Sequence, residues 1–312
     1  MKTTERGLNS IRIINGIINF LVLAAVMLLL GISLYALWDS RQIYLAAGSF
    51  QYAVYKPSQS DEGKSFRQLQ MINSEVFAWL TVYDTNIDYP VTQARDNMKY
   101  INTSAEGRYS LSGAIFLDSS NSKDFTDFNS IIYGHHMARK TMFGEIGRFA
   151  DKQMFDTHEY GNLHINGKDH GIEFFAFVHT DAYNGKIFTP NVLGENLRQT
   201  YLDNLLEEAM YTRDIGVTIQ DKIVLLATCS SSSTNGRDIL VGRLTDVPLA
   251  GPHEIGGQPH ICVDHEHYGP AFILWLILHI IIIALLAALI FIMLKKKQKE
   301  ENALEAWAES DE

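Results

Sequence analysis

Apolar residues concentrate in two long stretches near the two ends of the 312-residue chain. Residues 13–38 (IINGIINFLVLAAVMLLLGISLYALW) contain no charged residue, and residues 271–294 contain only the ionisable His279. Each stretch is long enough to cross a hydrocarbon core about 30 Å thick as a helix. The first stretch is longer than the apolar core of a signal peptide and leads into LYALWDS instead of a small-residue cleavage site, which favours an uncleaved anchor.

Basic residues lie outside both apolar stretches, toward the ends of the chain. Lys2, Arg6 and Arg12 precede the first stretch, and a lysine-rich segment, residues 295–299, follows the second. Because basic residues are retained in the cytoplasm, we predict that both termini are cytoplasmic and that residues 39–270 lie outside the membrane. A buried core helix is the alternative for the second stretch, and the lack of charge over its length argues against it.

The region between the two predicted spans changes character near Phe77. From there, short runs rich in Val, Ile, Phe and Tyr are separated by Gly, Asn, Asp and Pro, a pattern typical of many short strands in a barrel or sandwich. Residues 191–213 interrupt this pattern with apolar residues at helical spacing, which predicts a helix just before the next strand. The apolar face of that helix would comprise Leu197, Tyr201, Leu202, Leu205 and Ala209.

Composition limits the remaining possibilities. The formal net charge is −10 and no basic face is evident outside the membrane flanks, so we expect no nucleic-acid partner. The two cysteines, Cys229 and Cys262, offer no disulfide framework, so a sizeable core must stabilise the domain. Cys262 lies in HICVDHEHYGP, which matches no metal-binding spacing; we expect a free thiol there, and no metal or other cofactor.

Candidate chemistry centres on Cys229. This residue ends the apolar run IVLLAT, and Arg237 opens a second apolar run eight positions later. If the two runs pair as antiparallel strands, Cys229 and Arg237 lie opposite each other at one end of a sheet. The arginine would then favour a thiolate and could hold an oxyanion. The alternative is that Cys229 is a small buried hydrophobic residue.

A nucleophilic cysteine also needs a proton partner. The strand-like segment NSIIYGHHM supplies His135 and His136, and alternation along a strand lets only one of them face a given cleft. Asn235 or an aspartate could orient the imidazole as in papain-like enzymes, and no spacing in the sequence selects between them.

Four segments together resemble class B sortases, the cysteine transpeptidases of Gram-positive cell surfaces. They are FNSIIYGHHMARKTMFGEI, DYPVTQARDNMKYIN, GAIFLDSSN and LLATC, the last followed by Arg237. The resemblance covers roughly residues 70–245 and implies a mainly β fold, an eight-stranded sortase-type β-barrel with helical insertions, here flanked by two transmembrane helices. It also implies that Cys229 is the nucleophile, His135 the general acid/base with His136 as its neighbour, and Arg237 the catalytic arginine. The usual TLxTC motif of the family reads LLATC in this chain, and a C-terminal span is atypical of the family's simple anchoring enzymes.

The implied activity is that of a membrane-anchored transpeptidase. It would cleave a C-terminal sorting signal of secreted proteins through a thioester and join them to an amine of a peptidoglycan precursor or of a pilin. Two alternatives stay open: an extracytoplasmic cysteine protease that uses water as acceptor, and a non-enzymatic cell-surface protein. No LPxTG-like or NPxTN-like pentapeptide precedes residue 271, which argues against a sorted surface protein.

The predicted organisation follows from these patterns, in chain order: cytoplasmic N-terminus 1–12, transmembrane helix 13–38, helical extension 39–75, sortase catalytic domain 76–250, juxtamembrane linker 251–270, transmembrane helix 271–294 and cytoplasmic tail 295–312.

Overall fold

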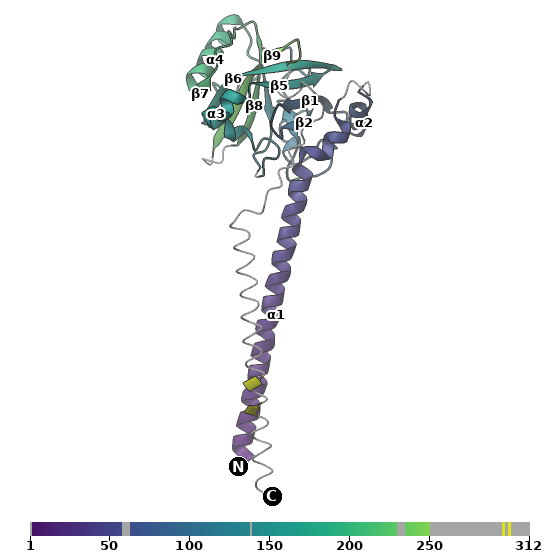
Figure 1. Cartoon of the computed structure of the whole chain (residues 1–312), viewed down its shortest axis with the longest axis vertical. Helices are drawn as coiled ribbons and strands as arrows, with labels where there is room; N and C mark the ends of the chain where they lie inside the picture. Colours follow the sequence, from purple (N-terminus) through teal and green to yellow (C-terminus); the bar gives the residue numbers. More distant parts are fainter. Residues whose placement is uncertain are drawn as a thin grey trace. The chain divides into compact units, whose positions relative to one another are not determined.

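The structure is a computed structural model that describes residues 2–57, 63–137, 139–229, 235–249, 295–296 and 299–300. The chain forms two compact units, Met1–Cys262 and Val263–Glu312. Nearly all described residues belong to the first unit, which contains a long N-terminal helix and a β-rich domain (Figure 1). The predicted second span, residues 271–294, and Cys262 with its neighbouring histidines lie outside the described residues.

Helix α1 runs without interruption over Lys2–Ala47. It includes the first predicted span, and its large apolar side chains are exposed, with Phe20 at 69% and Leu28 at 65%. Within the described parts of the chain, this region (Ile13–Tyr55, peak mean hydropathy 2.7) is the one candidate for a membrane-spanning helix. The helix continues past the apolar stretch, so that its last residue, Ala47, is fully buried in the β-rich domain.

The β-rich domain is a closed barrel with one additional strand. Its sheet has the order β5-β1-β2-β3-β4-β8-β9-β6-β7, and a further pairing of β5 with β6 closes a ring of eight strands. The mainly β, eight-stranded barrel is therefore confirmed, with β7 added at the edge of β6. The strands are β1 (Val76–Val82), β2 (Asp88–Thr92), β3 (Ile115–Leu117), β4 (Asn129–Tyr133), β5 (Tyr160–Ile165), β6 (Lys168–Asp181), β7 (Ala209–Thr212), β8 (Lys222–Cys229) and β9 (Gly236–Thr245).

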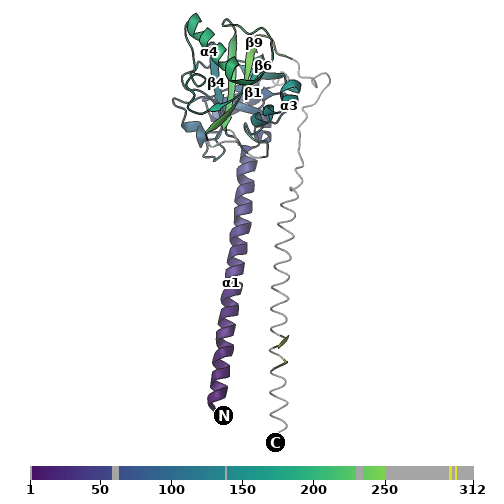
Figure 2. The same ribbon diagram turned by 90° about the vertical axis from the view of Figure 1, so that its left-hand side faces the viewer.

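Short helices lie around the barrel, before its first strand and in the connections between its strands (Figure 2). The predicted helix near residue 200 is confirmed as α4, but it ends at Glu208, and Ala209 opens strand β7 instead of closing the helix. Ala209, Tyr211 and Thr212 pair with the edge of β6, and the β-favouring side chains of Tyr211 and Thr212 at this edge override the helical spacing. The helices are η1 (Ser49–Tyr55), α2 (Lys64–Ile72), η3 (Lys99–Ile101), η4 (Ile146–Ala150), α3 (Lys152–Thr157) and α4 (Glu195–Glu208).

Strand alternation divides the apolar residues into two cores. In β8, Val224 and Leu226 belong to the larger core. The side chains on the opposite face of β8, among them Leu225, belong to a second core that also contains Tyr201 of α4. Tyr201, Leu202 and Leu205 of α4 are buried as predicted, but Leu197 is 62% exposed. In β9, Arg237 is two residues before Ile239 and four before Val241, both of which belong to the second core. Because side chains alternate along a strand, Arg237 lies on the same face of the sheet, the face that α4 covers.

Candidate active site

The strand order brings the three predicted site residues to one end of the sheet. Strand β8 lies between β4 and β9, and Cys229 pairs directly with Arg237, as the sequence predicted. On the other side, β4 runs parallel to β8 with Tyr133 opposite Ala227. The Gly134 N–H donates to the Ala227 carbonyl at 3.2 Å and completes this last pair of the β4–β8 ladder. His135 follows two residues after this pair on one chain segment, and Cys229 follows two residues after it on the other.

The two histidines lie after β4 and not within it. Strand β4 ends at Tyr133, and the backbone of His136 forms an isolated bridge with Met142, so the strand-like reading of NSIIYGHHM was wrong at its C-terminal end. The reason is local: a Cβ at Gly134 would lie 2.5 Å from Ile115 Cδ1 and 2.7 Å from the Phe143 ring. The backbone approaches its neighbours closely there, and the chain turns out of the sheet.

The His135 imidazole is half-buried and held by a backbone group. Its Nε2 lies 2.8 Å from the carbonyl oxygen of Ile101, in η3. Because a carbonyl can only accept, Nε2 must carry the proton, which leaves Nδ1 of the neutral ring as an acceptor. The carbonyl also fixes the orientation of the ring, which is the role that a carboxylate or an asparagine has in other Cys–His pairs. The sequence suggested Asn235 or an aspartate as the group that orients the imidazole. Among the described residues, the hydrogen-bond partner of the His135 ring is the Ile101 carbonyl instead.

His136 is directed toward different neighbours. Its Nδ1 is buried and has no hydrogen-bond partner among the described residues. A Cβ at Gly147 of η4 would lie 3.0 Å from Asp238 Oδ2 and 3.9 Å from His136 Cε1, so a glycine is needed for η4 to pack this closely. Asp238 is itself buried, and its Oδ1 lies 2.7 Å from His179 Nδ1. These contacts make His136 a packing residue.

Arg237 is half-buried at the start of β9, with its guanidinium turned back along its own strand. Nη1 donates to the Gly236 carbonyl at 2.9 Å and lies 3.5 Å from the Asn235 carbonyl. The Asn235 carbonyl also accepts from the Ala182 N–H at 2.8 Å, which ties the start of β9 to the end of β6. A backbone-bound guanidinium at this position keeps a fixed positive charge beside the strand end that carries Cys229.

The Ile101 carbonyl, which contacts His135, belongs to a segment, η3, that side-chain hydrogen bonds hold in place. Next to Ile101, the buried Tyr100 donates its hydroxyl to Glu75 Oε2 at 2.6 Å and accepts from Asn73 Nδ2 at 2.9 Å. Lys99 Nζ adds a 2.7 Å ion pair to the same carboxylate. Burial opposes ionisation of Glu75, but the hydrogen bonds from Lys99 and Tyr100 outweigh it and lower the pKa of this carboxyl. Burial raises the pKa of Tyr100, so its hydroxyl stays protonated and able to donate.

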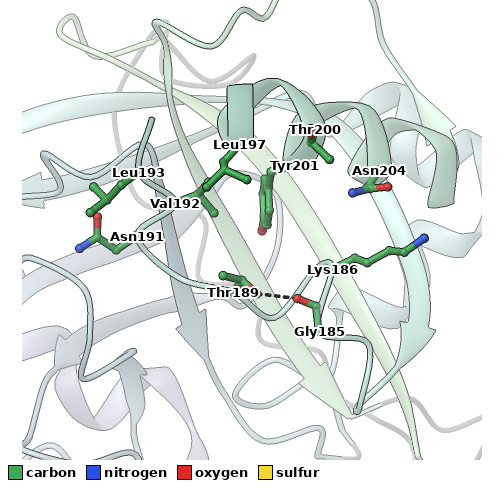
Figure 3. A pocket seen from close by; sticks show the side chains of 10 residues that line it. All are labelled: Gly185, Lys186, Thr189, Asn191, Val192, Leu193, Leu197, Thr200, Tyr201 and Asn204. Carbon is green, nitrogen blue, oxygen red and sulfur yellow. Dashed lines mark hydrogen bonds between the residues drawn. The ribbon is translucent and has the colours of Figure 1, made fainter. Parts of the chain in front are cut away.

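A shallow pocket of about 360 Å³ lies between the Gly185–Leu193 segment and α4 (Figure 3). Leu193 and Leu197 are exposed beside it, and Tyr201 forms part of its wall. All of its lining residues come from the connection between β6 and β7, and none of the three predicted site residues is among them. Among the residues that the structure describes, no group of three or more His, Cys, Asp or Glu side chains is arranged to hold a metal.

A closed eight-stranded barrel with a cysteine paired to an arginine at one strand end, and a histidine shortly after the neighbouring strand, is the arrangement expected of a cysteine transpeptidase. No family model matches the chain. It is 31% identical to sortase B of Listeria monocytogenes over 182 residues, which cover 57% of this chain and 73% of that relative. The chain belongs to the class B sortases, and it is therefore an enzyme, a cysteine transpeptidase.

Two solved structures extend this relationship. Sortase B from the type II pilus of Streptococcus pneumoniae is 46% identical and aligns over 58% of this chain and 98% of its own, with a TM-score of 0.51. A Streptococcus pyogenes class B sortase involved in pilus biogenesis is 39% identical and aligns over 59% of this chain and 99% of its own, with a TM-score of 0.54. In both, nearly the whole relative corresponds to a little over half of this chain.

Proposed function

We propose that this sortase is anchored in the membrane through α1 and joins secreted proteins, by their C-terminal sorting signal, to an amine of a pilin. The observation that supports the chemistry is the direct pairing of Cys229 with Arg237, together with the end of β4 beside β8 two residues before His135. The choice of a pilin amine over a peptidoglycan amine is supported by the two relatives at 46% and 39% identity, which are both pilus sortases.

In the proposed mechanism, the Cys229 thiolate attacks the scissile carbonyl of the sorting signal and forms a tetrahedral oxyanion. Collapse of this intermediate breaks the C–N bond and leaves a thioester, while His135 gives its Nδ1 proton to the leaving amine. The incoming amine then attacks the thioester, transfers a proton back to His135 and releases the Cys229 thiolate. His135 keeps its Nε2 proton on the Ile101 carbonyl throughout, so the neutral imidazole stays oriented between the two half-reactions, with Nδ1 free to accept the proton of the incoming amine.

Arg237 has the role of an oxyanion clamp in this proposal. Its guanidinium can leave the Gly236 carbonyl and donate two parallel N–H groups to the developing oxyanion or to the substrate backbone. Because the residue cannot lose its proton at working pH, it contributes charge and geometry but no proton transfer.

We further propose that the catalytic domain is extracytoplasmic and that both chain ends are cytoplasmic. The first part rests on the exposed apolar surface of α1 and the basic residues before it. The second rests on the apolar sequence of residues 271–294 and the lysines that follow.

The test is a ligation assay with the purified full-length chain in detergent. Quenched fluorescent peptides with NPxTN-like and LPxTG-like pentapeptides serve as donors, and a lysine-containing pilin peptide and triglycine serve as acceptors. We expect a ligated product with the lysine peptide, no thioester or product in Cys229→Ala, and unchanged activity in the control variant Cys262→Ala. Ligation to triglycine alone would indicate a wall amine as acceptor, and hydrolysis that ignores every amine would support the protease alternative instead.

A further inference from the structure

The segment His135–Gly144, here named the histidine loop, is closed on itself directly after the predicted catalytic histidine. The Phe143 N–H donates to the His135 carbonyl at 3.0 Å, and His136 forms a bridge with Met142. The Gly144 N–H closes a turn onto the Thr141 carbonyl at 2.9 Å. The position of the His135 backbone therefore depends on where residues 142 and 143 are held.

The histidine loop contains strained backbone. Arg139, Lys140 and Met142 have φ values of 58°, 55° and 53°, in the left-handed region that non-glycine residues rarely adopt. Met142 is also buried, so it cannot relax toward solvent. Backbone of this kind persists only where the surrounding structure fixes it, and it clusters at functional sites.

The Tyr89 hydroxyl provides this fixation. Tyr89 lies on β2 and is 1% exposed, and its hydroxyl accepts from the Met142 N–H at 2.9 Å. The same hydroxyl donates to the carbonyl of Ala47, the last residue of α1, also at 2.9 Å. A single buried hydroxyl thus joins the end of the N-terminal helix to the strained residue of the histidine loop.

A second contact joins the same two segments. The Arg139 guanidinium lies 4.6 Å from the centre of the Tyr44 ring, one helical turn before Ala47. Burial raises the pKa of Tyr89, which keeps its hydroxyl protonated and able to hold both partners at any working pH. The described contacts therefore attach the histidine loop to the end of α1 at a buried point, Tyr89, and at a point nearer the surface, Tyr44.

We infer that Tyr89 is a positioning residue for the sortase reaction, which sets the place of His135 through Met142 and makes the end of α1 part of the catalytic support. This inference rests on the proposed role of His135. It implies that the N-terminal helix contributes to turnover, in addition to any role in localisation.

The test compares Tyr89→Phe with Tyr52→Phe in the full-length chain. Tyr52 is a matched control, because its hydroxyl is also buried in the larger core but interacts with Ser104 and Ala105, outside the histidine loop. With the fluorescent NPxTN-like and LPxTG-like peptides, we expect kcat to fall about fivefold in Tyr89→Phe with KM within about twofold, since a buried hydrogen bond contributes about 1 kcal/mol. Tyr52→Phe should stay within about twofold of the wild-type kcat.

A substrate-independent readout accompanies the kinetics. The rate of Cys229 alkylation by iodoacetamide is followed against pH by mass spectrometry, which separates Cys229 from Cys262. A displaced imidazole stabilises the thiolate less, so the alkylation midpoint should move to higher pH in Tyr89→Phe and stay unchanged in Tyr52→Phe. If Tyr89→Phe fails to fold, Tyr44→Ala removes the second attachment, and we expect about a threefold loss of kcat with the same direction of pH shift.

The outcomes separate the inference from the function on which it rests. Equal kcat losses and equal alkylation midpoints in the two tyrosine variants would show that Tyr89 only fills the core. If the wild-type chain processes no peptide, the proposed function fails, and the alkylation midpoints still decide whether Tyr89 positions the histidine. An unchanged midpoint in both Tyr89→Phe and Tyr44→Ala would overturn the inference.

Discussion

The two adjacent histidines offer a sharp test of the proposed active site, because they differ in their contacts and not in their type. The His135 Nε2 lies against the Ile101 carbonyl, whereas His136 packs inward with a buried Nδ1 that has no hydrogen-bond partner among the described residues. We predict that His135→Ala lowers kcat by about 10²–10⁴, the usual contribution of a general acid/base. This loss corresponds to about 3–5 kcal/mol of transition-state stabilisation.

The matched variant His136→Ala should behave in the opposite way. Its ring is half-buried against η4, so its removal costs packing, on the order of 1–3 kcal/mol of unfolding free energy. The same change removes a buried polar atom that has no partner among the described residues, which places the cost at the lower end of that range. We therefore expect kcat within about fivefold of wild type and a lowered melting temperature.

Both variants are assayed in the same way, by initial rates of ligation at several pH values and by thermal unfolding. The pH dependence of the wild-type rate should be lost in His135→Ala and persist in His136→Ala, because His135 transfers the proton in the proposed mechanism. Equal losses of kcat in the two variants, or a greater loss in His136→Ala, would refute the assignment of His135.

Three further predictions follow from the geometry. Arg237→Lys keeps the charge but loses the planar pair of donors, so turnover should fall about 10²-fold or more with little change in the pH profile of Cys229 alkylation; near-normal turnover would contradict the clamp. Glu75 has a folded-state pKa below its ordinary value of 4.5, so its stabilising contribution is complete above that pH and is lost as the pH falls through the lower value. Acid unfolding followed by fluorescence should thus be less steep in Glu75→Gln, and an identical transition would show that the bonds from Lys99 and Tyr100 contribute nothing. A reporter that is active only in the cytoplasm should be active when fused after Glu312, and silence from a well-expressed fusion would refute the two-span topology.

The sequence best predicted the contacts between residues that are close together along the chain. Cys229 and Arg237 belong to adjacent antiparallel strands joined by a short loop, so their register could be predicted from eight positions of spacing. The parallel pairing of β4 with β8 joins residues more than ninety positions apart, which periodicity cannot predict. The resemblance to sortases, and not the pattern, gave His135 its place beside this pair.

The elements that support the site were beyond the reach of sequence patterns for a different reason. The Ile101 carbonyl that holds His135 is a backbone group, which every residue type supplies equally. Tyr89 occurs in DYPVT, where alternation predicts a buried strand residue but gives no sign of a hydroxyl bridging two distant backbone groups. The sequence predicted a helix over the residues of β7, because this strand has four residues. So short a stretch of alternating side chains cannot be told from the end of the helical spacing of apolar residues before it.

Backbone groups hold two of the proposed catalytic side chains, and this has a consequence for how the site tolerates change. The Ile101 carbonyl orients His135, and the Gly236 carbonyl orients Arg237. A change of side chain at residue 101 therefore leaves the hydrogen bond to His135 in place, provided that the backbone of η3 does not move. The vulnerable points are then the residues that hold the backbone: Tyr100 with Glu75 for η3, and Tyr89 for the histidine loop. Activity should therefore respond to the loss of a buried tyrosine hydroxyl at a distance from the reacting atoms more than to conservative apolar changes beside them.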